Sequence, residues 1–270
     1  MDTISVVCVN FNNTGYTRKL MESLRTQRGR TEEFTVECII VDNSTCAEEA
    51  EECGKLARCY SWITYSRPPE NLGYFGGLNY GLSISNAGDR QFVIIGNNDL
   101  QFDNEFCSDL HKREYDAKVF AVCPDIITAD GLHQNPHILR RIGRFRRFQL
   151  DLYYSHYYMS RILLLILKII RPVKSSRWQP PRACEIHMGV GACYILTAKF
   201  FKHFKKLNYP FFLYGEEAYI SEQIHSEGGI LWYDPGLRVH HAESASLSKL
   251  PSRATYEFER TGFPDFRKLM

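Results

Sequence analysis

The chain lacks several features that would assign it at once to a class. Its nine cysteines form no CxxC pair, and it has no internal repeat or low-complexity tract. The longest apolar stretch, Ile162 to Ile170, contains Lys168 and is far shorter than the roughly 20 residues of a membrane-spanning helix. No basic segment precedes the first apolar run, so we expect no signal peptide. These absences predict reduced thiols in a cytoplasmic protein without a transmembrane segment.

The composition carries no extreme either. With 270 residues, 44% of them hydrophobic and 24% charged, the chain is long enough for a sizeable core and ordinary for a globular protein. A formal net charge of +2 does not indicate a nucleic-acid partner, and we predict none. One segment is strongly basic, with arginines at positions 140, 141, 144, 146 and 147.

The first half of the chain alternates short β-branched runs with helix-length connections, which predicts an α/β fold with a mostly parallel sheet. Ligands of such sheets bind beyond the carboxyl ends of the strands. Polar clusters at 10–13, 42–45 and 97–99 fall at these ends, and Ser44 or Thr45 is placed to cap the next helix. The predicted strands are Ile4–Val9, Cys38–Val41, Trp62–Ser66 and Phe92–Gly96.

The second half is less regular. Residues 138–181 combine the arginines with aromatic and aliphatic residues and are interpreted as an insertion or lid. The glycine-rich segment 71–81 favours turns, although a helix follows it. Further elements are predicted at Phe120–Cys123, Gly189–Thr197, Glu216–Glu227 and, after a Pro-Gly turn, Leu237–His240.

Asp99 is a candidate metal ligand, because it follows a buried strand at the ligand-binding edge. Mg²⁺ or Mn²⁺ against a diphosphate needs only one or two protein carboxylates. The alternative is a polar turn that merely ends the strand.

Two further pairs carry possible chemistry. Glu216 and Glu217 begin a predicted helix, where either stabilises the helix dipole or acts as a general base. His240 and His241 end a strand-like run, where an imidazole can bind Mn²⁺ or serve as an ordinary structural residue.

Six motifs in one order resemble the family 2 inverting glycosyltransferases, over about residues 3–103 and 185–247. The motifs are Val6-Val7-Cys8-Val9-Asn10-Phe11-Asn12, Ile39-Ile40-Val41-Asp42-Asn43-Ser44, Asn71-Leu72-Gly73-Tyr74, Asn97-Asn98-Asp99, Phe211 to Glu217, and Asp234-Pro235 to His240. The resemblance implies a single domain over 1–270 with a GT-A, Rossmann-like fold. Within it, 1–103 would be the nucleotide-sugar half and 185–247 the acceptor and catalytic half.

The resemblance also implies the roles of individual residues. Glu217 would be the base, and Asp99 with His240 would hold Mn²⁺ or Mg²⁺, with Glu216 and His241 as the alternatives. Gly189 to Ala192 would shape the acceptor side. The chain departs from the family pattern at Leu78, Asn97, Tyr219 and Gln223. Residues expected beside the nucleotide and diphosphate are Val9, Asn10, Asp42, Asn43, Asn71, Gly73, Asn97 and Asn98.

The motif variants look most like rhamnosyl- and galactofuranosyltransferases of bacterial surface polysaccharides such as O-antigen (lipopolysaccharide) or capsule. The implied donor is a UDP- or dTDP-hexose, and the implied acceptor is a growing glycan, either free or lipid-linked. The segment 140–170 would then contact the inner face of the cytoplasmic membrane peripherally; the alternatives are a solvated loop or a dimer contact. A non-catalytic sugar-nucleotide-binding homologue remains the alternative function. A nucleotidyltransferase is disfavoured, because 10–15 contains no Arg or Lys.

Overall fold

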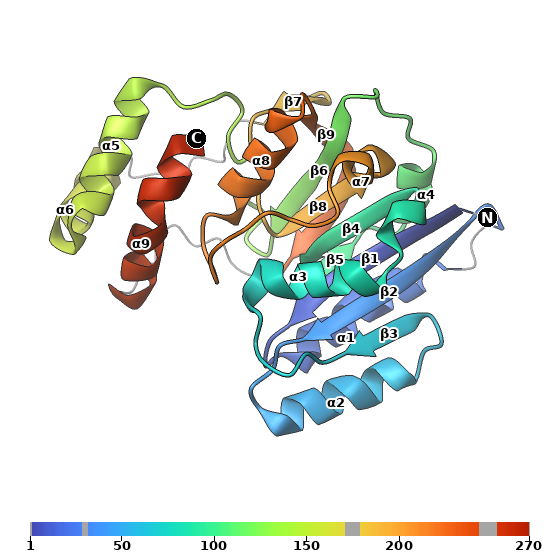
Figure 1. Ribbon diagram of the computed structural model, residues 1–270. Coiled ribbons are helices and arrows are strands. Elements are labelled where there is room, and N and C mark those ends of the chain that lie inside the picture. Colours follow the sequence, from blue (N-terminus) through green and yellow to red (C-terminus); the bar gives the residue numbers. More distant parts are fainter. Residues whose placement is uncertain (1, 29–31, 171–178, 243–252, 270) are drawn as a thin grey trace.

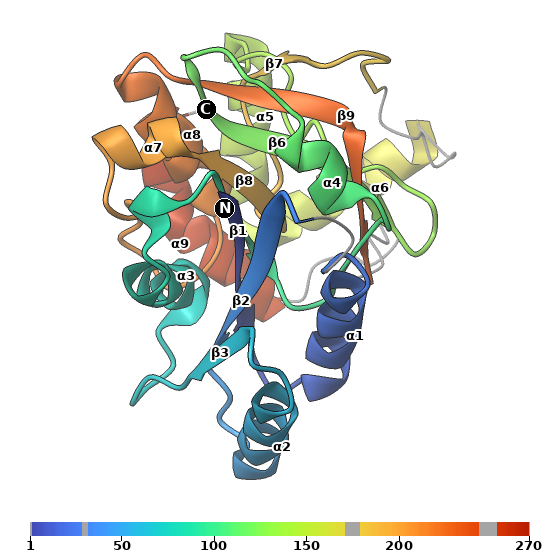
Figure 2. The same cartoon turned by 90° about the vertical axis from the view of Figure 1, so that its right-hand side faces the viewer.

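The computed structural model describes residues 2–28, 32–170, 179–242 and 253–269. Within them the chain forms a nine-stranded mixed sheet in the order β3-β2-β1-β4-β8-β6-β9-β5, with β7 paired to β9. Helices cover both faces of this sheet (Figures 1 and 2). The strands are β1 (Asp2–Asn10), β2 (Phe34–Asp42), β3 (Ile63–Ser66), β4 (Phe92–Asn97), β5 (Leu100–Phe102), β6 (Val119–Thr128), β7 (Cys184–Ile186), β8 (Cys193–Thr197) and β9 (Ile230–His241).

The predicted parallel arrangement holds for the first four long strands. β1 pairs in parallel with both β2 and β4, and β2 pairs in parallel with β3. The registers align Asn10 with Asp42 and Val9 with Asn97, so three strand ends meet at one edge of the sheet. Antiparallel pairs of β8 with β4 and β6 make the second half mixed. The predicted Pro-Gly turn at 235–236 lies inside β9, where the register with β6 is irregular: Pro124 pairs with Asp234, and the next residue, Asp125, pairs with Arg238.

Alternation along the strands sends side chains into two apolar layers. On one face, Ile4, Val6 and Cys8 pack with residues of α1, α2 and α4; on the other, Val7 and Val9 pack with α3, α7 and α8. Figure 2 shows α1 and α2 on the side of β1 and β2 opposite α3. The helices are α1 (Thr14–Arg25), α2 (Ala47–Arg58), α3 (Gly73–Ile84), the short 3-10 helix η1 (Ala87–Asp89), α4 (Phe106–His111), α5 (Arg144–Ser155), α6 (Tyr157–Ile170), α7 (Ala198–His203), α8 (Glu216–Ser226) and α9 (Arg253–Leu269).

The predicted cap of α2 is not formed by Ser44 or Thr45. Cys46 occupies the capping position, and its side chain accepts no hydrogen bond from the backbone amides of the helix. The hydroxyl of Ser44 instead accepts hydrogen bonds from Asn10 Nδ2 at 3.1 Å and from the Asn12 amide at 2.9 Å. The polar turn after β2 therefore holds the turn after β1 and leaves the helix start uncapped.

The glycine-rich segment is a helix rather than a turn. Gly73, Gly77 and Gly81 recur every four residues in α3, and Gly77 and Gly81 face the strands of the sheet. A Cβ at Gly81 would lie 2.3 Å from Val7 Cγ1, and one at Gly77 would lie 2.8 Å from Val9 Cγ2. The glycines thus let the helix approach the strands more closely than any side chain would permit. The sequence pattern predicted turns here because clustered glycines allow unusual backbone conformations. It does not show how closely a helix packs on a sheet.

The predicted insertion at 138–181 contains the hairpin of α5 and α6, while 171–178 lie outside the described residues. Figure 1 shows this hairpin beside α9, at the end of the molecule beyond α8. Tyr154 of α5 stacks on Phe263 of α9 with ring centroids 4.3 Å apart. None of the helices in the described part of the chain combines the length and apolar character that crossing a bilayer requires.

Candidate active site

A cleft of about 560 Å³ lies at the sheet edge where β1, β2 and β4 end. It brings together residues from both halves of the chain, as the order of the motifs predicts. Of the predicted residues, it places Val9, Asn43, Asn71, Gly73, Asn97, Asn98 and Glu217 on its wall. The other lining residues are Phe11, Tyr74, Gln134, Val190, Gly191, Ala192, Phe212, Leu213, Tyr214, Glu216 and His241.

One side of the cleft is suited to a polar planar group. Asn43 Nδ2 donates to the Gly73 carbonyl at 2.8 Å, which orients the amide. Its Oδ1 is buried and accepts no hydrogen bond from any described residue. A buried acceptor without a donor is costly, so this oxygen is a ready partner for an N–H of a bound ligand. Asn71 Oδ1 accepts from the Gly73 amide at 2.9 Å and holds the start of α3 at the same wall.

Asn10 and Asp42, which were predicted beside the nucleotide, are buried at the ends of β1 and β2. Both side chains are buried beneath the cleft wall and do not line it. Asp42 accepts hydrogen bonds from Asn10 Nδ2 at 2.9 Å and from the Tyr65 hydroxyl at 2.6 Å. Each polar group already has a protein partner, so the pair supports the site from below without facing a ligand.

Asn98 connects this buried support to the turn that follows β4. Its Nδ2 lies within hydrogen-bond distance of Asn10 Oδ1 at 2.9 Å, Thr17 Oγ1 at 2.9 Å and the Asn13 carbonyl at 3.1 Å. These partners come from β1, α1 and the loop between them. The 97–99 turn is therefore fixed before any ligand arrives.

Asp99 and His241 form the second polar side of the site. His241 Nε2 lies 3.1 Å from Asp99 Oδ1, and both side chains are largely buried. Asn97 Nδ2 lies 3.2 Å from the same His241 nitrogen, and His241 Nδ1 lies 2.9 Å from Gln134 Oε1. A consistent network has Nδ1–H donating to Gln134, which leaves the Nε2 lone pair directed toward Asn97 and Asp99.

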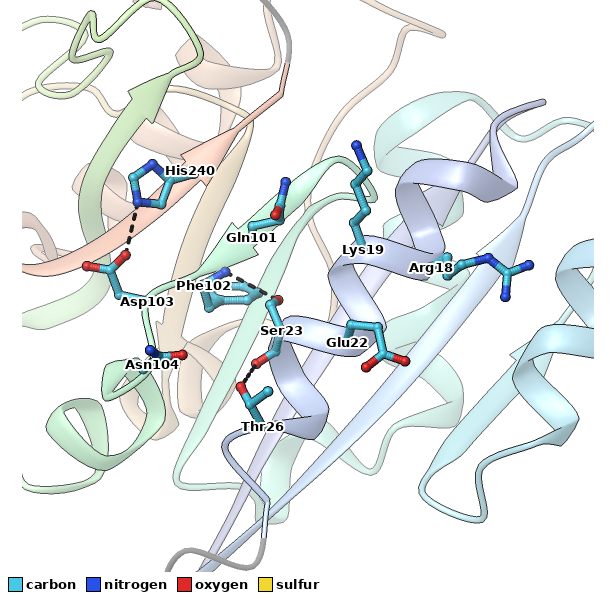
Figure 3. Close-up of a pocket in the computed structure, with 10 residues that line it drawn as sticks. All are labelled: Arg18, Lys19, Glu22, Ser23, Thr26, Gln101, Phe102, Asp103, Asn104 and His240. Carbon is cyan, nitrogen blue, oxygen red and sulfur yellow. Dashed lines mark hydrogen bonds and ion pairs between the residues drawn. The ribbon is translucent and has the colours of Figure 1, made fainter.

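His240, the residue first assigned to the metal, lies on the other face of β9. Figure 3 shows it with Asp103 in a separate surface groove, where its Nε2 lies 3.0 Å from Asp103 Oδ1. Neighbouring residues of a strand point to opposite faces, so one of the two histidines had to face away. The geometry thus favours the alternative, His241, as the imidazole beside Asp99.

The residues present fit a divalent cation. Asp99 Oδ1 is buried and has no hydrogen-bond donor assigned among the described residues, and in the His241 tautomer that donates from Nδ1 to Gln134 it faces the unprotonated Nε2. Two acceptors this close favour a cation between or beside them. Among the residues that the structure covers, no group of three His, Cys, Asp or Glu side chains could hold a metal. A donor diphosphate would therefore supply the remaining oxygens, as Mg²⁺ sites commonly require.

Glu217 faces the same cleft at the first turn of α8. Its Oε1 accepts a hydrogen bond from the Gly191 amide at 3.1 Å. Tyr74 lies close by and donates its hydroxyl to the Gly191 carbonyl at 2.8 Å. Burial raises the pKa of Tyr74, and carboxylates that include Glu216, Glu217 and Asp99 raise it further. Carboxylates from both halves of the chain therefore act on one hydroxyl.

Glu216 differs from its neighbour in environment. It is buried, and its Oε1 accepts from the Tyr214 amide at 2.9 Å. Burial first, and then the Glu217 carboxylate, raise the pKa of Glu216 from 4.5 to about 7. The structure therefore favours Glu217 as the accessible carboxylate and Glu216 as a support that is partly protonated near neutral pH.

This shift predicts a pH dependence of stability. Between pH 4.5 and about 7 the native state holds more protons on Glu216 than the unfolded state does. Stability must then fall as pH rises through this window, and the loss persists above it. Urea unfolding, followed by tryptophan fluorescence, measures the free energy of unfolding across this pH window. We expect it to fall more in wild type than in Glu216→Gln, with a difference of up to about 3 kcal/mol. Parallel curves for the two proteins would contradict the assignment.

Several lining residues were missed by the sequence reasoning. Gln134 comes from a segment without periodicity, and nothing in the sequence marks it. The loop from Phe212 to Tyr214 lies inside a quoted motif but received no role. Tyr214 and Gly215 have positive φ values of 72° and 94°, and the Phe212 carbonyl would lie 2.4 Å from a Cβ at Gly73. This loop therefore closes directly onto the start of α3.

The fold resembles those of solved glycosyltransferases. Staphylococcus aureus TarS 1–349 with UDP-GlcNAc matches with a TM-score of 0.57 and 14% identity over 93% of this chain and 62% of that one. GalNAc-T7 with UDP, GalNAc and Mn²⁺ matches with a TM-score of 0.58 and 16% identity over 94% of this chain and 47% of that one. The mannosyltransferase PcManGT from Pyrobaculum calidifontis, with GDP-Man and Mn²⁺, matches with a TM-score of 0.54 and 14% identity over 93% of this chain and 58% of that one.

These similarities establish a GT-A fold, a mixed sheet flanked by helices. The chain spans between 47% and 62% of the length of these solved chains. No curated protein sequence matches it significantly. The model of the family described as "Glycosyl transferase family 2" matches residues 5–171, more than half of the chain. This protein therefore belongs to glycosyl transferase family 2.

Proposed function

We propose that the protein is a metal-dependent, inverting glycosyltransferase that uses a nucleoside-diphosphate sugar. The observation that carries this proposal is a single cleft with two functional sides. One side holds His241, whose Nε2 lies 3.1 Å from the Asp99 carboxylate behind the cleft wall, and the other side holds Glu217. Inverting displacement needs a base on one face of the sugar and charge neutralisation of the departing diphosphate on the other. Family membership and the neighbours' nucleotide and Mn²⁺ ligands support the proposal.

The residues divide the work as follows. Asn43 and Val9 accept the nucleotide base at the ends of β2 and β1, while Asp99 and His241 hold the cation. Bound Mn²⁺ or Mg²⁺ supplies Lewis-acid stabilisation of the leaving diphosphate. Glu217 receives the proton of the acceptor hydroxyl as the hydroxyl oxygen bonds to the sugar carbon. The Gly191 amide orients that carboxylate at 3.1 Å.

We infer a UDP- or dTDP-hexose, rhamnose or galactofuranose among them, as the donor and a growing cell-surface glycan as the acceptor. This finer assignment follows the motif forms at 41–44, 71–74 and 211–217 and places the enzyme in O-antigen or capsule synthesis. A lipid-linked acceptor would bring the protein to the cytoplasmic face of a membrane. The alternative is an inactive sugar-nucleotide-binding homologue. It is favoured by Asn97, which occupies a position where the family has an acid.

Nucleotide-dependent stabilisation tests the proposal directly. We expect one of UDP, dTDP, GDP or CMP, together with Mn²⁺ or Mg²⁺, to raise the melting temperature. A ligand at ~100 times its Kd stabilises the native state by roughly 2.7 kcal/mol, and each kcal/mol raises the melting temperature of a domain of this size by about 2–4 °C. Asp99→Ala should keep the native fold and lose the metal-dependent part of the shift. A screen in which no nucleotide shifts the melting temperature, with or without metal, would sink the donor assignment.

A further inference from the structure

The α5–α6 hairpin carries an apolar face that no described part of the chain covers. Ile162, Leu165, Ile166 and Ile169 are exposed, and Ile169 has 78% of its surface accessible. Their spacing of three, four and seven residues places them on one side of α6. Phe145 of α5 is 75% exposed. Isolated exposed apolar residues are common, but a continuous stripe of this kind marks an interaction surface.

The opposite side of the hairpin faces the protein. Leu150 and Tyr154 pack against the apolar cluster that includes Phe263 and Phe266 of α9. Ser160 of α6 is fully buried. These positions lie roughly half a turn away from the exposed residues of the same helices. The hairpin is therefore docked by one face and presents the other outward, while no residue of α5 is fully buried.

These two helices and the segment before them carry an excess of positive charge. Residues 140–170 contain seven Arg and Lys and one acid, Asp151. Asp151 is neutralised by Arg267 of α9, whose Nη2 lies 2.6 Å from Asp151 Oδ2. Arg140, Arg144 and Arg146 are exposed at the start of α5. An apolar stripe on the same pair of helices as basic residues that have no acidic partner among the described residues fits a surface that is apolar inside and negatively charged outside.

We propose that the α5–α6 hairpin binds the surface of an anionic lipid bilayer. The face of Ile162, Leu165, Ile166 and Ile169 enters the boundary between headgroups and acyl chains, and the arginines contact headgroup phosphates. A second copy of the chain is the weaker occupant, because a symmetric contact would bring two basic clusters together without acids to offset them.

The hairpin is connected to the cleft wall through α9. Tyr154 stacks on Phe263, and a Cβ at Gly215 would lie 2.7 Å from Phe266 Cδ1. Gly215 directly follows the loop from Phe212 to Tyr214 that lines the cleft. In Figure 1 the hairpin, α9 and α8 follow one another from the end of the molecule toward the sheet. Bilayer binding would bring this wall near lipid, and the use of that position for a lipid-linked acceptor rests on the proposed function.

Co-sedimentation with vesicles tests the surface. We expect the full chain to bind vesicles that contain phosphatidylglycerol, to bind pure phosphatidylcholine vesicles far less, and to dissociate at high salt. Arg144→Glu with Arg146→Glu should weaken binding at least ~10-fold, since each basic residue near an anionic surface contributes measurably. Lys205→Glu with Lys206→Glu, after α7, makes the same charge change elsewhere and should leave binding unchanged.

The apolar part needs its own variant pair. Ile166→Ser with Ile169→Ser should weaken vesicle binding on the order of ~10-fold, whereas Ile84→Ser on α3, which is 40% exposed, should have no effect. All variants remove exposed groups, and unchanged melting temperatures would confirm folding. The inference is overturned if wild type ignores anionic vesicles. It is also overturned if sedimentation equilibrium shows a dimer that the hairpin variants dissociate. Nucleotide-induced stabilisation is measured without lipid, so failure of either proposal leaves the other testable.

Discussion

Glu217→Gln is expected to reduce sugar transfer by about 10²–10⁴-fold, because general-base assistance contributes that much. The amide keeps the size of the side chain and its oxygen can still accept the Gly191 hydrogen bond of 3.1 Å. Donor binding should therefore persist, with the loss confined to kcat. Turnover is measured as nucleotide release in the presence of acceptor, and donor affinity by calorimetry.

Two variants of the same helix act as controls. Glu222→Gln removes a carboxylate from α8 outside the cleft and should leave kcat unchanged. Glu216→Gln removes the buried neighbour, which the structure assigns to support, and should cost much less than Glu217→Gln. If Glu216→Gln lowers kcat more than Glu217→Gln does, Glu216 is the general base and Glu217 is the supporting residue. Full activity of both variants would remove the general base from the mechanism.

Asp99→Ala is expected to lower kcat/KM by at least about 10²-fold, since a Lewis acid on the leaving group is worth several kcal/mol. His241→Ala should also lower kcat/KM, and its turnover should depend less on the Mn²⁺ concentration than that of wild type. His240→Ala provides the matched control, because it is the same residue type one position away on the opposite face of β9. Metal titrations of turnover compare the three variants.

The contrast between the adjacent histidines is the decisive outcome. If His240→Ala loses metal dependence and His241→Ala keeps it, the cation does not sit beside Asp99 as assigned. If both histidine variants lower turnover only slightly and to the same extent, Asp99 and the substrate diphosphate are the principal metal ligands. Neither imidazole is then essential for metal binding.

The strands and their polar ends were predictable, because buried parallel strands are short β-branched runs with abrupt polar stops. Ile4–Val9 and Cys38–Val41 lie within β1 and β2. Cys8 and Cys38 are buried free thiols, as predicted. The short elements β5, β7 and α7 were not predicted, since each has three to six residues and only long-range pairing or packing stabilises it. The amphipathic helix α9 was also missed.

The site was predictable at the level of motifs and less so at the level of side chains. Motif order predicted that Glu217 and the 97–99 turn meet, and the cleft contains Glu217, Asn97 and Asn98, but motif order did not distinguish a lining residue from one beneath the wall, such as Asp99. Asn10 is fully buried because its amide has partners on β2, α1 and the 97–99 turn. Such a network joins residues up to 88 positions apart. No local pattern in the sequence records it.

The paired histidines have a further consequence for β9. Three register pairs tie this strand to β5, with His241 opposite Leu100, and Val239 opposite Phe102 is buried. A slip of one residue would ordinarily replace the ligand by an unrelated side chain. Here it would present His240 instead, so that ligand chemistry would survive while Val239 turned outward. The histidines thus do not help to fix the alignment of this strand, and the repeated imidazole makes the proposed metal side of the site tolerant of an error that the core would reject.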